Sequence, residues 1–249
     1  MKPSLEQHQA EIQQNLRSWE TKPLLQKIYA GFYDRIVTLI DERLPGRIVE
    51  IGSGIGNLKS RLPRALATDL FPNPWLDLVC DGYDLPFRDG CVSHLVLFDV
   101  FHHLEAPNAF LQDARRVLTK SGRVILFEPF ISLCSYPVYG MFHHEPVAMG
   151  KDINLTQTSA RPRAYYAAQG NATRLFFRRE FALGPTARDW NVFHAEAFGC
   201  FHYLLSGGFR KPAMYPAGWL DPLRNLDAKL SRWPSLFGGR CLVGMRPVE

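Results

Sequence analysis

The clearest helical spacing of apolar positions lies in the first 45 residues. Between residues 21 and 43 these positions recur every three or four residues, at Leu25, Ile28, Phe32, Ile36 and Leu39. Such spacing places them on one face of a helix, which Pro45-Gly46 would end. The polar segment before it predicts another helix over residues 4–18.

Beyond residue 46, short apolar runs alternate with turns and helical segments. Strands are predicted at 48–51, 64–70, 76–80, 93–98 and 123–127, with a helix at 107–118. Strands that alternate with helices indicate a parallel, doubly wound α/β sheet. Further along, the pattern predicts a helix over 194–205, a sixth strand entered at 206–209, a helix over 220–230 and a last strand over 240–245.

A glycine-rich turn follows the first predicted strand. It reads R-I-V-E-I-G-S-G-I-G-N from Arg47 to Asn57, and residues 57–62 predict the start of a short helix. A strand, a glycine turn and a helix start form the layout that holds nucleotides in α/β folds. The dinucleotide fingerprint G-x-G-x-x-G would need a glycine where this chain has Asn57, and a carboxylate, Glu50, stands two residues before the first glycine.

Glu50 changes which ligand the turn can hold. A pyrophosphate seeks backbone N–H donors at a helix N-terminus, and a carboxylate beside the turn would repel it. S-adenosyl-L-methionine (SAM) suits the turn better, because it has an ammonium group, a sulfonium group and no phosphate. The spacing E-x-G-x-G-x-G resembles motif I of the class I SAM-dependent methyltransferases. A glycine turn without a ligand is the simpler alternative, since glycine repeats alone are weak evidence.

The resemblance covers roughly residues 47–130 and implies a series of cofactor contacts. Asp69 lies 17 positions after Gly52 at the end of a predicted strand, where a carboxylate accepts ribose hydroxyls. Asp81 begins a D-x-x-x-L-P-F segment that resembles the adenine-binding segment of this superfamily. Residues at strand ends border the ligand. The cofactor contacts implied are Glu50, Gly52, Ser53, Gly54, Gly56, Asn57, Asp69, Leu70, Asp81, Gly82, Phe98 and Asp99.

Two histidine pairs follow predicted strand ends and are the candidates for catalysis. His102-His103 lies in an H-H-L segment that resembles one in the family, and His143-His144 follows the fifth strand. A neutral imidazole can take a proton from an acceptor hydroxyl. His103 and His144 are therefore predicted as base or acceptor-orienting groups, with Glu145 beside His144. Alternatively, these histidines only pack and hydrogen-bond within their loops.

The chain is predicted to form one domain, a Rossmann-like, doubly wound, mostly parallel seven-stranded α/β fold. Residues 1–45 would be an N-terminal helical lid, 46–130 the SAM-binding half, 131–200 a substrate-side insertion after strand five, and 201–249 the last strands. By family analogy the last strand pairs antiparallel. The aromatic content of the insertion suits an apolar or lipid-linked acceptor, or equally a small satellite core. Tyr33 would either touch SAM from the lid or, more simply, only pack against its neighbours.

Composition narrows the class of protein. With 249 residues, 46% of them hydrophobic, the chain can bury the core of one large α/β domain. Its five cysteines lack a C-x-x-C pair and predict reduced thiols in a cytoplasmic protein, with no metal site. No run of about 18 apolar residues predicts a membrane span. The net charge of +5 is concentrated in residues 131–249, which have 14 Lys and Arg against 8 Asp and Glu.

This basic half would suit an anionic acceptor, a lipid surface or a plain solvated surface. DNA and RNA amino-methyltransferases have an N/D/S-P-P-Y/F segment after strand four, where this chain reads F-D-V-F, so no nucleic acid partner is expected. We expect methyl transfer to a small-molecule acceptor, apolar or lipid-linked, with peripheral lipid contact. The alternatives are a non-catalytic SAM-binding protein or regulator, a nicotinamide dehydrogenase and a basic adaptor.

Overall fold

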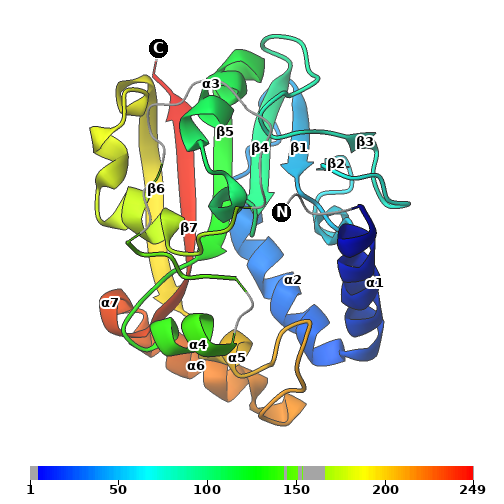
Figure 1. Ribbon diagram of the computed structural model, residues 1–249, viewed down its shortest axis with the longest axis vertical. Coiled ribbons are helices and arrows are strands. Elements are labelled where there is room, and N and C mark those ends of the chain that lie inside the picture. Colours follow the sequence, from blue (N-terminus) through cyan, green and yellow to red (C-terminus); the bar gives the residue numbers. More distant parts are fainter. Residues whose placement is uncertain (1–4, 143–144, 151–152, 154–165, 249) are drawn as a thin grey trace.

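A seven-stranded sheet runs through the part of the chain that the computed structural model describes, residues 5–142, 145–150, 153 and 166–248 (Figure 1). The strand order across the sheet is β3-β2-β1-β4-β5-β7-β6. The strands are β1 (Arg47–Ile51), β2 (Leu66–Asp69), β3 (Leu78–Val79), β4 (Val92–Phe98), β5 (Leu118–Pro129), β6 (Trp190–Gly199) and β7 (Gly238–Pro247).

The sheet is mixed. Strand β1 pairs in parallel with β2 and β4, and the pairs β2–β3 and β4–β5 are also parallel. Strand β7 enters between β5 and β6 and is antiparallel to both. The predicted seven-stranded α/β sheet and its antiparallel last strand are confirmed in this form.

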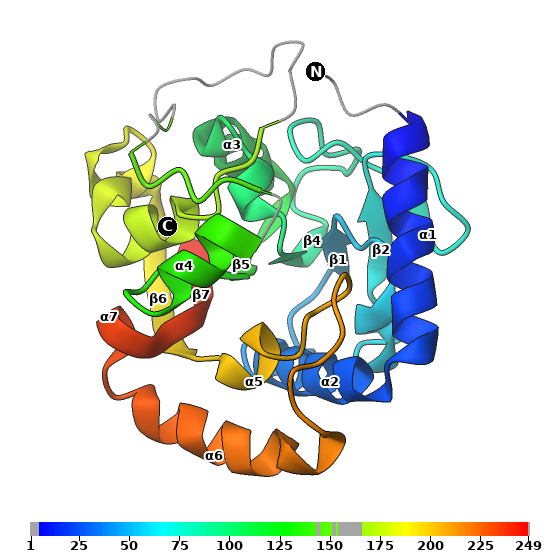
Figure 2. The same ribbon diagram turned by 60° about the horizontal axis from the view of Figure 1, so that its bottom comes forward.

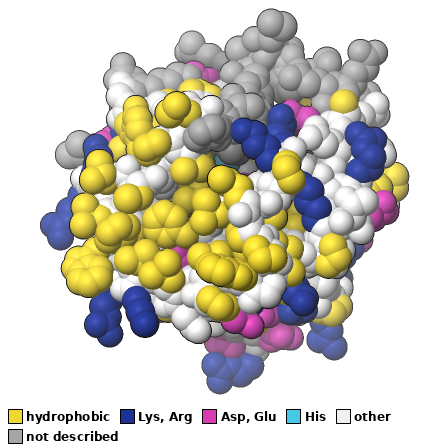
Figure 3. Space-filling model, turned by 90° about the horizontal axis from the view of Figure 1, so that it is seen from below, with side chains coloured by type: hydrophobic (Ala, Val, Ile, Leu, Met, Phe, Trp, Pro, Cys, Tyr) yellow, Lys and Arg dark blue, Asp and Glu magenta, His cyan; other side chains and the backbone are white. Residues whose placement is uncertain are grey.

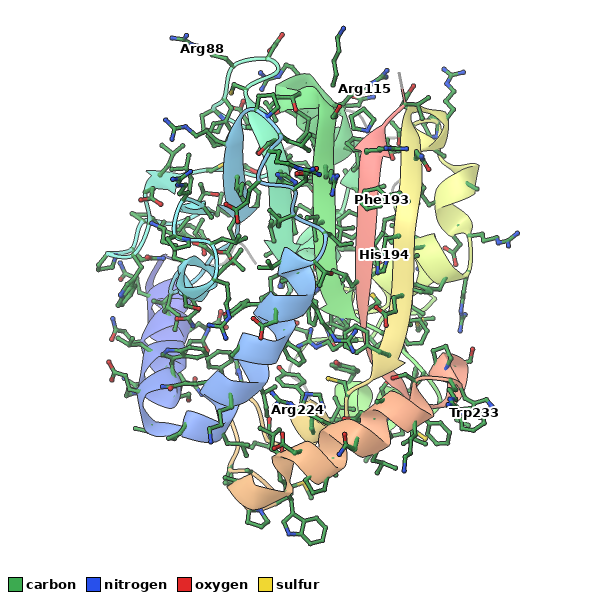
Figure 4. All side chains as sticks on the ribbon, turned by 180° about the vertical axis from the view of Figure 1, so that it is seen from behind. Arg88, Arg115, Phe193, His194, Arg224 and Trp233 are labelled. Atoms are coloured by element: carbon green, nitrogen blue, oxygen red, sulfur yellow. The ribbon has the colours of Figure 1, made fainter. Side chains whose placement is uncertain are left out.

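Alternate residues of the central strands face two different layers. Leu95 and Leu97 of β4 pack in one core cluster with Phe110 of helix α3 (Pro107–Val117). Val96, between them, packs in a second cluster with Phe32 of α2 (Pro23–Val37). Because β4 is buried on both faces, its sequence is a continuous apolar run and does not alternate. Viewed from behind, α2 lies across its face of the sheet (Figure 4).

Helices α4 to α7 gather at the edge to which the carboxyl ends of β1, β4 and β5 point (Figures 1 and 2). Helix α1 (Leu5–Thr21) stands beside the β2–β3 edge of the sheet. The helices at the carboxyl edge are α4 (Ser135–Phe142), α5 (Phe201–Leu204), α6 (Leu220–Leu230) and α7 (Pro234–Phe237). A role of α1 and α2 as a lid stays a prediction.

The helix predicted over residues 194–205 is wrong. This segment contains most of β6, which pairs with β7 from Trp190 to Gly199, and then the short α5. The sixth strand predicted at 206–209 is wrong as well, since these residues form a turn. Alanine and glutamate favour helix, but pairing along a whole strand outweighs such a local preference. The sixth strand therefore lies inside the segment predicted as an insertion.

Two predicted helices are shorter than expected. After the glycine turn the chain forms only a 3-10 turn, Asn57–Ser60, because Pro63 disfavours helical backbone at the residue before it. Helix α2 ends at Val37 and not near residue 43. Beyond it, the backbone N–H of Asp41 donates to Nε2 of His94 on β4 at 3.1 Å.

Candidate active site

A cavity of about 610 Å³ opens beside the carboxyl ends of β1 and β4. Its wall also includes residues of α1, α2, α4 and the segment 203–211. This edge of an α/β sheet is where ligands bind, because the loops that follow parallel strands meet there. The predicted site residues that line the cavity are Glu50, Gly52, Ser53, Gly54, Asn57, Phe98, Asp99 and His103.

The glycine turn has a backbone conformation that glycine adopts without strain. Gly52, Gly54 and Gly56 have φ angles of 68°, 56° and 71°. A Cβ at Gly52 would lie 2.4 Å from Cγ2 of Val100, so packing excludes a side chain there. At Gly54 the nearest atom would be Cδ1 of Ile12, at 4.0 Å. The first glycine therefore allows close packing, and the second leaves room in the cavity for a ligand.

Glu50 is a buried carboxylate beside this turn. It is 4% exposed, and its Oε2 atom has no hydrogen-bond partner among the described residues. Burial, together with the charge of Asp69, raises the pKa of Glu50 to about 8, although Lys59 opposes this. An ammonium group would supply both the missing donor and a counter-charge. This carboxylate therefore fits the cationic methionine part of SAM.

Asp69 joins the end of β2 to the glycine turn. Its Oδ2 accepts the N–H of Gly54 at 3.0 Å, and its Oδ1 accepts the N–H of Leu70 at 2.7 Å. A carboxylate oxygen can accept more than one hydrogen bond, so these contacts are compatible with binding a ribose. The ribose role of Asp69 stays a prediction.

Some predicted cofactor residues lie outside the lining of the cavity. Oδ1 of Asp81 accepts the N–H of Tyr83 at 2.9 Å and so shapes a turn. A Cβ at Gly82 would be 3.7 Å from Cγ2 of Ile51, within the core of the domain. The adenine contacts of Asp81 and Gly82 stay predictions. The predicted residues outside the lining are Gly56, Asp69, Leu70, Asp81 and Gly82.

An ion pair joins the end of β4 to β7 inside the cavity. Nη1 of Arg240 contacts Oδ1 of Asp99, and Arg240 is only 2% exposed. Asp99 has a φ of 57°, a left-handed conformation that aspartate tolerates better than most residues. The guanidinium carbon of Arg240 also lies 4.6 Å from the centre of the Tyr203 ring. The pair fixes the loop after β4 against the far half of the sheet.

Aromatic rings form much of the cavity wall. Tyr29 stands at the centre, with ring centroids 5.3 Å from Phe98, 5.2 Å from Phe209 and 6.0 Å from Tyr203. Burial raises the pKa of Tyr29 and of Tyr203, so both hydroxyls stay protonated at neutral pH. The wall therefore offers apolar ring surfaces with a few neutral hydroxyl groups.

A second network of charged groups occupies another side of the cavity. Nδ1 of His102 lies 2.6 Å from Oε2 of Glu128, and Nε2 lies 3.2 Å from Oε2 of Glu145. Burial alone would lower the pKa of His102, but the two carboxylates outweigh it and raise the pKa to about 10. Glu128 also accepts the backbone N–H groups of Val100 and Phe101 at 2.9 and 2.7 Å.

His103 contacts acceptor oxygens through both ring nitrogens. Its Nε2 lies 3.2 Å from Oε1 of Glu145, and its Nδ1 lies 3.0 Å from the carbonyl oxygen of Tyr166. These contacts favour an orienting role over proton abstraction, and a role as base stays a prediction. His144, the other predicted catalytic residue, lies outside the described residues.

The segment 207–211 is tied to the N-terminal helices. Nζ of Lys22 donates to the carbonyl oxygens of Gly208 and Lys211, both at 2.9 Å. The hydroxyl of Ser18 donates to the carbonyl oxygen of Phe209. Since Gly207, Gly208 and Phe209 line the cavity, these bonds connect α1 and α2 to its wall.

Several residues of the cavity are not predicted from the sequence. Arg240 falls only within the predicted last strand, although a charged residue within the apolar run G-G-R-C-L-V-G-M is itself a signal. Tyr29 and Tyr203 carried no signal beyond apolar spacing. Tyr33, for which packing was the simpler of two predictions, belongs to a core cluster and also lines the cavity.

The comparisons with known proteins agree with this architecture. Residues 49–126 match the family model described as a methyltransferase domain. A SAM-dependent methyltransferase from Thermotoga maritima is 14% identical, with a TM-score of 0.50 and 96% of this chain and 99% of that chain covered. The geranyl diphosphate C-methyltransferase from Streptomyces coelicolor A3(2), solved with S-adenosyl-L-homocysteine, is 13% identical, with a TM-score of 0.50 and coverages of 88% and 81%.

The [4+2]-cyclase SpnF is similar to the same degree, with 12% identity and a TM-score of 0.50, and the match covers 88% of this chain and 81% of that chain. No curated protein matches the sequence. Identities this low show the fold alone, and one fold supports several chemistries. The strand order and the glycine turn define a Rossmann-like fold of the methyltransferase type. With the family match over residues 49–126 added, the chain contains a methyltransferase domain of the SAM-dependent type, and its cofactor is SAM.

Proposed function

We propose that this methyltransferase acts on a small acceptor that is apolar or lipid-linked. The observation that carries the proposal is the continuity between the aromatic cavity and an exposed apolar surface. Met141 of α4 lines the cavity and is 75% exposed. An acceptor with an apolar chain could therefore place its reactive end in the cavity while the chain stays in contact with this surface.

The exposed apolar surface extends over the helices around the cavity. Leu133 and Tyr136 are 70% and 54% exposed, and the backbone N–H of Leu133 donates to the carbonyl oxygen of Ser235 on α7 at 3.1 Å. Seen from this end, apolar side chains gather together and Lys and Arg side chains lie around their margin (Figure 3). An apolar surface with a basic margin suits a lipid acceptor with an anionic head group.

The residues of the cavity have separate roles in this proposal. Glu50 would hold the ammonium group of SAM, and Gly54 would leave room for it. When bound, SAM supplies an electrophilic methyl group on a sulfonium leaving group. The rings of Tyr29 and Phe98 would exclude water and orient the acceptor, which supplies most of the rate in such a transfer.

The test is methyl transfer to fractions of a cell extract. The enzyme would be incubated with SAM labelled in its methyl group, and the label followed into an organic and an aqueous phase. We expect label in the organic phase, and none with Gly54→Val, which removes the room for the cofactor. Label that enters only water-soluble products would contradict the proposal.

A matched pair of variants compares a charge placed at the cavity opening with the same charge placed elsewhere on the surface. Met141→Lys places a charge at the cavity opening, whereas Met214→Lys changes a residue that is 79% exposed and outside the lining. We expect Met141→Lys to raise the KM for an apolar acceptor at least about tenfold with unchanged affinity for S-adenosylhomocysteine. Met214→Lys should change neither value.

The location in the cell is part of the same proposal. None of the helices in the described part of the chain has the length and apolar character needed to cross a bilayer. We propose a cytoplasmic protein with peripheral lipid contact, which co-sedimentation with anionic and neutral vesicles would test. If the protein binds neither kind of vesicle, the proposed lipid contact is wrong.

A further inference from the structure

Two histidines converge on one carboxylate in the wall of the cavity. Nε2 of His102 and Nε2 of His103 lie 3.2 Å from the two oxygens of Glu145, one on each. The two imidazole rings are 4.3 Å apart at their centres. One ligand atom from each of these three residues lies within 4.8 Å of the others. All three residues line the cavity, so the cluster is open to it.

The other nitrogen of each histidine faces an acceptor. Nδ1 of His102 is held by Glu128 at 2.6 Å, and Nδ1 of His103 by the carbonyl oxygen of Tyr166 at 3.0 Å. In protein metal sites the nitrogen that does not bind the ion donates its proton in this way, to a carboxylate or a backbone carbonyl. With Nδ1 of each ring held by its own acceptor, Nε2 is the nitrogen that faces Glu145 and is placed to bind an ion.

Both Nε2 atoms face an oxygen of Glu145, so either a proton or a metal ion lies between each nitrogen and its oxygen. A proton fills this place when no metal is bound, and a divalent ion would displace it. Glu145 is 9% exposed and also accepts from Nε2 of Gln169 at 3.2 Å, which fixes its orientation. A divalent cation among the three side chains would satisfy all of these groups at once.

We propose that His102, His103 and Glu145 bind a divalent first-row transition-metal ion of the zinc type. Two imidazole nitrogens and one carboxylate oxygen match the ligands of catalytic zinc sites, whereas magnesium and calcium prefer oxygen ligands alone. No spacing in the sequence predicts this site, because the two histidines and Glu145 are 42 or more positions apart.

Three protein ligands leave a coordination position open toward the cavity. This step rests on the proposed function. An acceptor hydroxyl bound there would release its proton to water more readily. Its oxygen would then form a bond to the methyl carbon while the carbon–sulfur bond breaks, and the electron pair would stay on sulfur. The products are a methyl ether and S-adenosylhomocysteine.

The test measures metal binding without any acceptor, so its result does not depend on the proposed reaction. The full chain, freed of metal by chelation, would be titrated with Zn²⁺ by calorimetry and with Co²⁺ by visible absorption. We expect one ion per chain, and affinity lower by at least about tenfold in His103→Gln and in Glu145→Gln. His194→Gln, which changes a histidine on β6 (Figure 4), is the matched control and should bind as the wild type does.

Crystallography keeps the test decisive if a variant fails to fold. Wild-type crystals grown with Zn²⁺ should give an anomalous peak about 2.0–2.2 Å from both Nε2 atoms and from an oxygen of Glu145. The proposal is overturned if the peak lies elsewhere, if no ion binds, or if folded His103→Gln and Glu145→Gln bind like the wild type.

Discussion

Replacement of Glu50 by glutamine tests the electrostatics of the cavity most directly. The variant keeps nearly the same shape and removes a buried ionisable group that has an oxygen without a described partner. It should therefore stabilise the protein without ligand and weaken binding of the cofactor. Few substitutions in the cavity are expected to move these two quantities in opposite directions.

The size of the stability effect follows from the pKa of Glu50, which the fold raises from 4.5 to about 8. Below pH 4.5 the carboxyl is protonated in both the folded and the unfolded state, and no stability is lost. As the pH rises toward 8, the unfolded state ionises while the folded state keeps its proton, so the folded state loses stability. At about 1.4 kcal/mol per pKa unit, the loss between pH 5 and pH 8 is about 3 kcal/mol.

The assay is urea unfolding of the wild type and of Glu50→Gln between pH 5 and pH 8. We expect the free energy of unfolding of the variant to exceed that of the wild type by a margin that grows with pH, to about 3 kcal/mol. Glu20→Gln, at an exposed position, should show no such trend. A constant difference between wild type and Glu50→Gln across this range would refute the reasoning.

The same variant should bind S-adenosylhomocysteine about 10- to 100-fold more weakly, because a hydrogen bond to a charged group contributes about 1.5–3 kcal/mol. Wild-type binding should strengthen as the pH rises toward 8, since the ammonium group favours the ionised form of Glu50. Calorimetry at several pH values would measure both effects. Unchanged affinity in Glu50→Gln would show that the ammonium group lies elsewhere.

The remaining predictions concern the glycine turn and the two ends of the sheet. Gly54→Val should abolish S-adenosylhomocysteine binding with the fold retained, as calorimetry and circular dichroism would show. Gly52→Ala should lower the free energy of unfolding by about 2–4 kcal/mol, because alanine is strained at this positive φ and its Cβ would contact Val100. Asp69→Ala should weaken cofactor binding by about 1–3 kcal/mol, and unchanged affinity would remove the ribose role. Arg240→Met should destabilise the protein by about 3–5 kcal/mol by leaving its acidic partner unpaired, while Arg246→Met, exposed on the same strand, should have little effect in the same unfolding assay.

The first half of the sheet could be predicted because its signals are local. Each strand from β1 to β5 contains a short apolar run, and Gly52 and Gly54 indicate a backbone conformation that other residues rarely adopt. The position of Glu50 before that turn was sufficient to favour a cationic ligand over a pyrophosphate. Such features depend on neighbours in the sequence, so they are visible without the fold.

The second half could not be predicted because it depends on pairing between distant segments. The spacing of His194, Ala195 and Ala197 favours a helix until β7 provides a partner strand for them. The position of Arg240 beside Asp99 joins segments 141 residues apart. Helix propensity and apolar spacing carry no information on contacts of this range.

The place of β7 between β5 and β6 has a consequence for how the protein is made. During synthesis β6 leaves the ribosome before β7, yet β7 is the strand with which it pairs. Until then, β5 and β6 each present an open edge to other chains, which favours aggregation. The arrival of β7 covers the open edge of β5 and one edge of β6, and it also brings Arg240 to Asp99. A nascent chain thus acquires its finished cavity only in the last step of assembling the sheet, so an incomplete product would lack both a protected edge and a working site.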